Sequence, residues 1–274
     1  MNIAAALQQA KQQIDKLDAE ALLAHVLEKD RSYFRAWPER EIENEPLRQF
    51  QQLLKRRADG EPLAYLTGWR EFWSLLLQVS PATLIPRPET ELLVEQALEK
   101  IPVDANWQIA DLGTGSGAIA LAIANERPGC HVVATDISTD ALAVAQSNAQ
   151  RLKISNIEFR QGSWHEALKQ GELFQLIAAN PPYIDANDKH LQYDGLPHEP
   201  LNALTPGTDG LTAIHIITEQ MKTHFRKPGW LLIEHGYDQG KAVRELLNKQ
   251  AYIEAHTLRD LSDNERLSIA RQAV

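Results

Sequence analysis

Cysteine is nearly absent from this sequence: Cys130 is the only one among 274 residues. A single cysteine excludes an internal disulfide, and such usage is typical of proteins that fold in a reducing compartment. The first eleven residues also lack the charged and apolar layout of a signal peptide. We therefore expect a cytoplasmic protein in which Cys130 is a small residue of the core.

Metal-ligand patterns and long apolar runs are missing as well. The nine histidines show no paired ligand spacing, and one cysteine cannot complete a zinc site, so we predict no metal. No segment approaches the roughly 18 apolar residues of a membrane helix, so we expect no membrane partner. The hydrophobic content of 43% and the charged content of 24% are ordinary for a globular protein.

The sequence contains fewer basic than acidic residues. It has 28 Lys and Arg and 37 Asp and Glu, which give a formal net charge of −9. A duplex-binding surface needs a positive field that attracts phosphates, so this balance argues against direct binding of nucleic acid. We therefore expect the substrate to be a protein or a small molecule rather than duplex nucleic acid. Nothing in the sequence requires more than a monomer, which is the state that we expect.

The chain divides into three parts. We predict a helical domain over 1–60, a β-hairpin linker over 61–86 and an α/β domain over 87–274. In the first part Asp18 is predicted to cap a helix over 19–27, and a second helix is predicted to begin near Pro46. About 60 residues enclose too little core for chemistry alone, so we predict that this domain recognises the substrate.

Apolar runs with short breaks predict the remaining elements. Aromatic and β-branched runs over 66–73 and 75–79 predict the hairpin. Further on, strands alternate with helices. The strands are predicted over 107–112, 130–135, 157–160, 174–179 and 230–234, and the helices include 118–125 and 139–151. A closing pair of strands is predicted over 251–259 and 266–273. This alternation predicts a Rossmann-like α/β fold, with a mostly parallel sheet and helices on both faces.

A glycine-rich loop follows the first strand of the α/β domain. Gly113, Gly115 and Gly117 alternate with Thr114 and Ser116 just ahead of a helix. Three glycines let the backbone turn tightly and let a ligand lie against it at a helix N-terminus. A dinucleotide-binding loop would carry its third glycine one residue later. With no pyrophosphate to hold, this loop is predicted to approach an amino-acid-like tail.

Two residues that follow the next strands suit a nucleoside. Asp136 ends the second strand 19 residues after Gly117, where a carboxylate can accept hydrogen bonds from both ribose hydroxyls of an adenosine group. Trp164 follows the third strand, where an aromatic ring would contact the adenine. A place in the core is the alternative for Trp164.

The strand over 174–179 ends in Asn180-Pro181-Pro182-Tyr183. Two prolines stop the strand, stiffen the loop and remove two N–H donors, so the Asn180 side-chain oxygen and the Pro181 carbonyl can accept from an N–H₂ group. Tyr183 would stack on that flat group. For the tetrapeptide alone an ordinary turn is the alternative. With the glycine loop and Asp136, it resembles S-adenosylmethionine-dependent methyltransferases that act on planar amino groups.

Residues 85–91 read Ile-Pro-Arg-Pro-Glu-Thr-Glu. Proline and acidic residues suit the first turn of a helix, so a helix is predicted to begin here. Two prolines around Arg87 are more than a helix start needs, and lining the pocket is the second interpretation of this segment. The sequence leaves the roles of Arg87 and Glu89 open.

Over nearly its whole length the sequence resembles the bacterial release factor glutamine methyltransferases, the protein-(glutamine-N5) methyltransferase family. The segments that carry the resemblance are 60–68, 85–91, 111–120, 180–183, Glu199-Pro200, Ala203-Leu204, Gly210-Leu211 and 234–236. His198 departs from the pattern, because the family usually has an aromatic residue before Glu-Pro. The departure bears on local packing or partner contact and leaves the chemistry intact.

The resemblance implies an enzyme that methylates the glutamine of the Gly-Gly-Gln motif in class 1 peptide chain release factors, on its side-chain nitrogen, with S-adenosylmethionine as the donor. It implies cofactor contacts from Gly113, Thr114, Gly115, Ser116, Gly117, Asp136, Trp164 and Asn180. It implies that the glutamine binds Asn180, Pro181, Pro182 and Tyr183, of which Asn180, Pro181 and Tyr183 are the catalytic residues. The sulfonium methyl is already activated, so neither a covalent intermediate nor a metal is required.

Two other functions fit parts of the sequence. A DNA adenine-N6 methyltransferase would use the same cradle for an adenine amino group, but it would need base flipping and a positive duplex surface. A non-catalytic scaffold could bind the cofactor and dock partners through the N-terminal helices. The net charge of −9 argues against the first function, and the intact tetrapeptide argues against the second.

Overall fold

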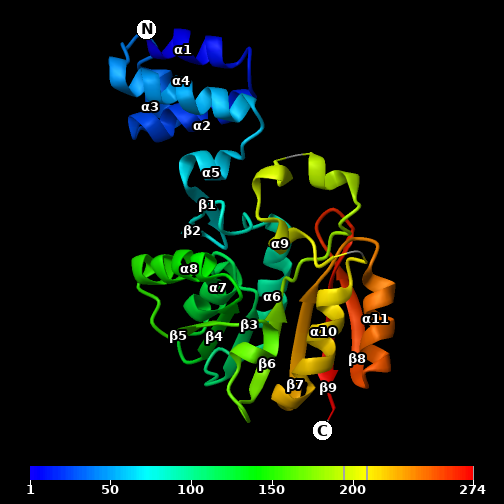
Figure 1. Ribbon diagram of the computed structural model, residues 1–274. Helices are drawn as coiled ribbons and strands as arrows, with labels where there is room; N and C mark the ends of the chain where they lie inside the picture. The colour runs from blue at the N-terminus through cyan, green and yellow to red at the C-terminus, as the bar shows by residue number, and fades with distance from the viewer. Residues whose placement is uncertain (194, 208, 274) are drawn as a thin grey trace. The chain divides into compact units, whose positions relative to one another are not determined.

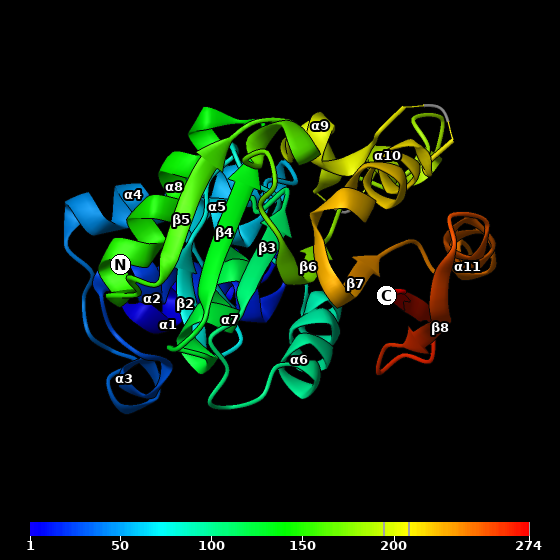
Figure 2. The ribbon, with the colours of Figure 1, turned by 90° about the horizontal axis from the view of Figure 1, so that it is seen from below.

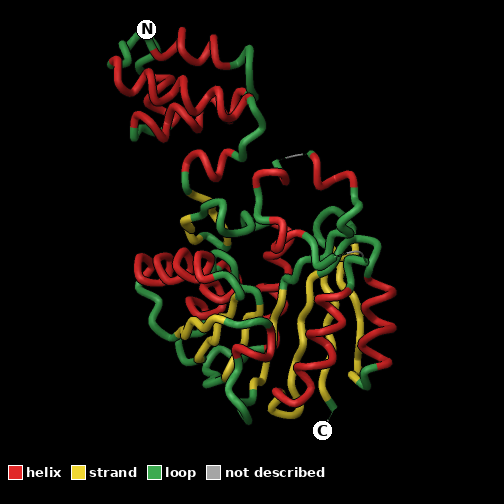
Figure 3. Tube along the Cα trace, in the orientation of Figure 1, coloured by secondary structure: helices red, strands yellow, loops and turns green. Residues whose placement is uncertain are grey.

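The computed structural model describes residues 1–193, 195–207 and 209–273. They form two compact units, one of Met1–Trp69 with Gln192–His198 and the other of Arg70–Leu191 with Glu199–Val274. Figure 1 labels the helices and strands along the chain. Figure 3 shows that the N-terminal segment is almost wholly helical and that the long strands come later.

The first unit is a small bundle of helices. Its helices are α1 (Ile3–Ala10), α2 (Lys16–Leu27), α3 (Arg31–Ala36), α4 (Asn44–Ala58), α5 (Leu63–Thr67) and the short 3-10 helix η4 (Leu196–His198). Leu22, Leu23 and Phe50 are buried in one core that α1 to α5 share. His198 lies beside Gly60, where an added Cβ would be 3.8 Å from the imidazole.

Helix α2 begins three residues earlier than the sequence predicts. Its N-cap is Asp15, whose side chain accepts a hydrogen bond from the Leu17 amide at 2.7 Å. Asp18 lies in the first turn, and its carboxylate pairs with Arg57 of α4 at 2.7 Å. The prediction of Asp18 as the N-cap is therefore wrong, because this residue is engaged by a partner from a distant part of the chain.

A two-stranded sheet, β1 (Trp69–Phe72) and β2 (Leu75–Gln78), confirms the predicted hairpin. The first strand was predicted to start too early, because Leu66 and Thr67 belong to α5. Gly68 ends that helix with a φ of 80°, a left-handed conformation that glycine adopts without strain.

The second unit is built on a seven-stranded sheet in the order β5-β4-β3-β6-β7-β9-β8, whose twist is visible in Figure 2. The strands are β3 (Gln108–Leu112), β4 (His131–Asp136), β5 (Ile157–Gln161), β6 (Phe174–Ala179), β7 (Phe225–Glu234), β8 (Tyr252–Arg259) and β9 (Glu265–Gln272). The strands from β5 to β7 pair in parallel, and β9 runs antiparallel to both of its neighbours. The predicted α/β fold with a mostly parallel sheet is confirmed.

Helices cover both faces of this sheet. Those that pack on it are α6 (Glu91–Lys100), α7 (Ala118–Glu126), α8 (Thr139–Leu152), α10 (Thr212–Gln220) and α11 (Gly240–Lys249). The connections contain α9 (Leu201–Leu204) and the 3-10 helices η1 (Pro88–Thr90), η2 (Trp164–Ala167), η3 (Lys189–Gln192) and η5 (Met221–His224). Among the described residues, no helix has the length and apolarity needed to cross a membrane.

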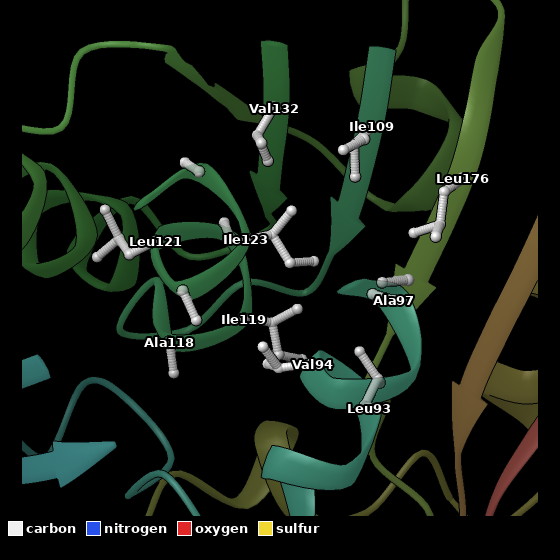
Figure 4. Packing of buried hydrophobic residues seen from close by; sticks show 14 of the residues in the cluster. Leu93, Val94, Ala97, Ile109, Ala118, Ile119, Leu121, Ile123, Val132 and Leu176 are labelled. Atoms are coloured by element: carbon white, nitrogen blue, oxygen red, sulfur yellow. The ribbon is translucent and has the colours of Figure 1, made fainter. Parts of the chain in front are cut away.

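Two cores form because successive residues of a strand point to opposite faces. Ile109 of β3 packs with α6 and α7, whereas its neighbour Ala110 belongs to the core under α10 and α11. Figure 4 shows the first core, in which Leu93 of α6 and Ile119 of α7 lie opposite the strands. Burying a Leu or Ile side chain of this size contributes roughly 1.5–3 kcal/mol to stability.

The strand order reverses between β3 and β6. Leu112, the last residue of β3, pairs with Ala179, the last residue of β6. The loops that begin at Gly113 and Asn180 therefore leave the sheet side by side at its carboxyl edge. Open α/β sheets bind ligands at such a reversal.

Candidate active site

A cavity of about 280 Å³ lies at the carboxyl edge of the sheet, within the second unit. It is lined by Ala82, Thr83, Leu84, Gly113, Gly115, Asp136, Ile137, Ser138, Ala141, Gly162, Ser163, Trp164, Asn180, Pro182, Asn202 and Ala203. The loops that follow β3, β4, β5 and β6 all contribute. Of the residues predicted to bind cofactor or substrate, Thr114, Ser116, Gly117, Pro181 and Tyr183 are outside this lining.

The glycine loop is held by the neighbouring strand. The amides of Gly113 and Thr114 donate to the Thr135 carbonyl at 2.9 and 2.8 Å. Gly117 closes the loop with a φ of 87°, and a Cβ on it would lie only 2.9 Å from a side-chain carbon of Leu121. Glycine is therefore required at Gly117 for two reasons, its backbone conformation and the close approach of the helix.

We expect Gly117→Ala to lower the free energy of unfolding by about 2–4 kcal/mol, since it adds left-handed strain and a clash with Leu121. Urea unfolding measures this change. Gly171→Ala is the matched control, because Gly171 has a φ of 75° and nothing within 4 Å of its added Cβ. That variant is expected to lose only about 1–2 kcal/mol. Equal losses at both positions would contradict the packing argument.

Asp111 is fully buried beneath the glycine loop. Its Oδ2 accepts from the Thr114 hydroxyl at 2.6 Å and from the Ala120 amide at 3.2 Å. Its Oδ1 is buried with no hydrogen-bond partner among the residues that the structure describes. Burial raises the pKa of Asp111 to about 7, and the charge of Asp136 adds to the rise. An unused buried carboxylate oxygen favours a cationic or N–H-bearing ligand nearby.

Asp136 lines the cavity, and two backbone amides orient its carboxylate. Oδ2 accepts from the Gly115 amide and Oδ1 from the Ser138 amide, each at 2.9 Å. Each oxygen can accept a further hydrogen bond, so the pair suits a diol. Burial raises the pKa of Asp136, and donors from a ligand would favour the ionised form.

Trp164 has a φ of 47°, which is uncommon for a residue other than glycine. Its ring lies against the glycine loop, since a Cβ on Gly113 would be 3.4 Å from a ring carbon. The residue both lines the cavity and packs against the core of that face. It gives the cavity a flat apolar wall.

The Asn180 loop presents an oxygen acceptor. Asn180 Nδ2 donates to the Thr90 hydroxyl at 3.1 Å, and no described residue donates to its Oδ1. At the other end of the loop, Gln239 Nε2 donates to the Tyr183 carbonyl at 3.0 Å. The tetrapeptide is therefore held at both ends by side chains from other parts of the unit.

Tyr183 makes a hydrogen bond that the sequence does not predict. Its hydroxyl donates to Glu234 Oε1 at 3.3 Å, while its ring packs against the core that contains α10. Burial and the nearby Glu234 carboxylate raise the pKa of Tyr183, so it remains a neutral phenol. Stacking of Tyr183 on a substrate stays a prediction.

The sequence alone predicts no role for Glu199 or Glu234, although both belong to segments that carry the family resemblance. Glu199 is 6% exposed, and its carboxylate accepts from the Ile85 amide at 3.0 Å and from Arg87 at 2.5 Å. This bond gives Arg87 a structural partner and fixes the segment that carries Thr90. A carboxylate that ends an apolar strand, as Glu234 does, is the signal that could have identified the site.

Solved structures share the fold of about three quarters of this chain. A ribosomal protein L11 methylase of Lactobacillus delbrueckii subsp. bulgaricus is 22% identical, with a TM-score of 0.52 over 72% of this chain and 85% of that chain. A T. thermophilus 16S rRNA methyltransferase, in complex with AdoMet and guanosine, is 17% identical, with a TM-score of 0.56 over 74% and 49%. Residues 103–273 match the family described as Methyltransferase domain. The protein is a class I S-adenosylmethionine-dependent methyltransferase.

Proteins of similar sequence identify the family within this class of methyltransferases. Residues 1–68 match the family described as PrmC N-terminal domain. The release factor glutamine methyltransferase of Escherichia coli is 50% identical over 93% of this chain and 91% of its own, and that of Pseudomonas aeruginosa 50% over 94% and 93%. The Coxiella burnetii enzyme is 48% identical over 94% and 92%. The chain belongs to the release factor glutamine methyltransferase family, as its sequence motifs predict.

Proposed function

We propose that this enzyme methylates the side-chain nitrogen (N5) of the glutamine in the Gly-Gly-Gln motif of class 1 peptide chain release factors, and so modulates translation termination. One observation carries the proposal: Asn180 lines the cavity with an Oδ1 that no described residue donates to. The neighbouring Pro181 contributes a carbonyl and no N–H. An N–H₂ group needs two such acceptors.

Hydrogen bonds to these two acceptors allow the unreactive amide nitrogen of the glutamine to attack the methyl group. The lone pair of an amide is delocalised, as the rotation barrier of roughly 18–20 kcal/mol shows. Asn180 Oδ1 and the Pro181 carbonyl accept its two hydrogens and aim the nitrogen. As positive charge develops on the nitrogen, these bonds strengthen, which lowers the barrier. In-line positioning can contribute up to roughly 7–11 kcal/mol.

We assign the cofactor to the cavity beside this loop. S-adenosylmethionine supplies a methyl group already activated on a sulfonium. Asp136 would accept its ribose hydroxyls, Trp164 would contact the adenine, and the loop from Gly113 to Gly117 would hold its amino-acid tail. The pre-oriented carboxylate of Asp136 and the unpartnered Oδ1 of Asp111 support this assignment.

We propose that residues 1–60 form the substrate-recognition domain, joined by a linker over 61–86 to a catalytic domain over 87–274. The match of residues 1–68 to a family of its own supports a separate role. The wild-type enzyme is then expected to methylate a full-length release factor with a higher kcat/KM than a short Gly-Gly-Gln peptide. Equal values for the two substrates would contradict a recognition role.

A transfer assay tests the proposed function. Tritiated S-adenosylmethionine is offered with purified release factor and, in parallel, with duplex DNA. We expect label in the release factor alone, and mass spectrometry is expected to place the methyl group on the glutamine of the motif. Label in adenine would favour a DNA methyltransferase, and no transfer to either would favour a scaffold.

A further inference from the structure

We propose that Gln239 is a positioning residue whose side-chain amide fixes the backbone of the Asn180–Tyr183 loop, and so the place of the Pro181 carbonyl. Gln239 lies in the turn after β7 and is the N-cap of α11. It is not one of the residues that line the cavity, so it acts through the loop. The inference rests on the proposed function, because it concerns an acceptor that the substrate nitrogen needs.

The two prolines of the loop make an outside anchor necessary. Pro181 and Pro182 have no N–H group, so this part of the loop must be held through its carbonyls. The fixed φ of both prolines also makes the loop stiff, so a shift of the Tyr183 backbone is transmitted to the Pro181 carbonyl. The bond from the Tyr183 hydroxyl to Glu234 holds the side chain and leaves the backbone carbonyl to another donor.

The side chain of Gln239 supplies that donor. Its Nε2 donates to the Tyr183 carbonyl at 3.0 Å and to the Gly210 carbonyl at 3.3 Å. Its Oε1 accepts from the Gly236 amide at 2.8 Å. One side chain therefore joins three loops, which follow β6, precede α10 and follow β7.

The Gln239 amide has only one favourable orientation. Each of its three partners is a backbone group with a single function, because an N–H only donates and a carbonyl only accepts. A rotation by 180° would place Oε1 against two carbonyl oxygens and Nε2 against an N–H. The donor that faces the Tyr183 carbonyl is therefore fixed without the help of a titratable group.

The turn that carries Gln239 is itself tied to the sheet. The Gly236 carbonyl accepts from the Gln239 backbone amide at 3.0 Å and from His235 Nδ1 at 2.9 Å. His235 is fully buried, and its backbone amide donates to the Arg266 carbonyl of β9 at 2.9 Å. The anchor of the loop therefore has a rigid base.

Gly210 shows independently how closely these loops approach. Its φ is 63°, and a Cβ on it would lie 2.6 Å from the Tyr183 carbonyl oxygen and 2.7 Å from Gln239 Nε2. A larger residue at this position would displace the carbonyl or the amide. The contact between Gln239 and the loop therefore depends on a glycine at position 210.

Two variants of the full-length enzyme test the inference, with kcat measured at saturating release factor and S-adenosylmethionine. Gln239→Glu keeps the shape but places an oxygen against two carbonyls, so at about pH 8.5 kcat is expected to fall about 10–100-fold. Gln239→Met removes donor and acceptor together, and a similar loss is expected. Asn248→Asp, an exposed amide-to-acid change on α11, is the control and is expected to keep wild-type kcat. The Kd of S-adenosylmethionine, measured by calorimetry, is expected to stay within about 2-fold in all three.

Acid is expected to restore the Glu variant alone, because a protonated carboxyl again carries a donor for the Tyr183 carbonyl. The ratio of its kcat to that of wild type should rise at least about 2-fold between about pH 8.5 and pH 5.5, while the ratio for Gln239→Met stays flat. A loss of stability alone would not produce this difference. The ratio cancels the titration of neighbouring groups that both enzymes share, which are His235 and Asp238 in the same turn, and Arg244 and Glu265 beside Gly240.

A folded Gln239→Glu enzyme with wild-type kcat at about pH 8.5 would overturn the inference. A ratio that does not rise in acid, or that rises equally for Gln239→Met, would do so too, as would a Kd of S-adenosylmethionine that weakens in step with kcat. If circular dichroism shows that the Glu variant is unfolded, the kcat and Kd of Gln239→Met decide. Wild-type transfer to glutamine in the same assay keeps the two proposals apart. Its absence refutes the proposed function, whereas transfer that both variants retain in full refutes only the role of Gln239.

Discussion

Asn180→Ala is expected to lower kcat about 10²–10³-fold, by analogy with the removal of one oxyanion-hole donor. The variant removes the acceptor whose hydrogen bond strengthens as charge develops on the substrate nitrogen. It also removes the hydrogen bond from Asn180 Nδ2 to the Thr90 hydroxyl, a loss of roughly 0.5–1.5 kcal/mol of stability. The effect should therefore appear in turnover and much less in stability.

Single-turnover methylation of a release factor measures this loss. Asn187→Ala is the matched control, since Asn187 is exposed on the same segment and bonds only Asp185 among the described residues. That variant is expected to keep wild-type kcat. Full methylation by a folded Asn180→Ala enzyme would refute the role assigned to Asn180.

Asp136→Ala is expected to raise the Kd of S-adenosylmethionine about 10–100-fold or more, with a smaller change in kcat. The reason is that hydrogen bonds to a charged group contribute roughly 1.5–3 kcal/mol each, and the carboxylate is placed to accept two hydroxyls. Two backbone amides hold it in position before any ligand binds. Little reorganisation is then needed on binding.

Isothermal titration calorimetry with S-adenosylmethionine checks this prediction. Asp140→Ala is a suitable control, because Asp140 is an exposed acid in the first turn of α8. Unchanged affinity in a folded Asp136→Ala variant would show that the ribose binds elsewhere. Circular dichroism shows whether the loss of the Gly115 and Ser138 contacts disturbs the fold.

Local patterns in the sequence predict the sheet and its loops well. The apolar run before Asn180 matches β6 from end to end, because a buried parallel strand is nearly all apolar and proline stops it. The glycines at 113 and 117 mark a real turn, since both have φ above 70°. These features depend on residues that are close together in the sequence, so the sequence pattern predicts them.

Contacts between distant residues are what the sequence does not reveal. The N-cap of α2 was misplaced because Asp18 is engaged by Arg57, 39 residues away. The partner of Asn180 is Thr90, 90 residues away, in a segment whose pattern predicts a helix start or a part of the pocket lining but no partner for Asn180. Hydrogen bonds between residues far apart in the sequence orient the site, and the spacing of apolar residues does not predict them.

The net charge of the chain excludes a class of function but identifies no residue of the site. A net charge of −9 argues against a duplex surface, yet it says nothing about the carboxylates at positions 111 and 234. Burial makes those two exceptional, because it raises the pKa of each to about 7. Both lie at strand ends beside the proposed site, as perturbed groups at functional sites often do.

The most direct measurement is a crystal structure of the enzyme with S-adenosylhomocysteine and a Gly-Gly-Gln peptide. We expect the carboxamide nitrogen to lie about 2.7–3.2 Å from both Asn180 Oδ1 and the Pro181 carbonyl oxygen. A carboxamide whose oxygen faces Asn180, or whose nitrogen contacts neither acceptor, would contradict it.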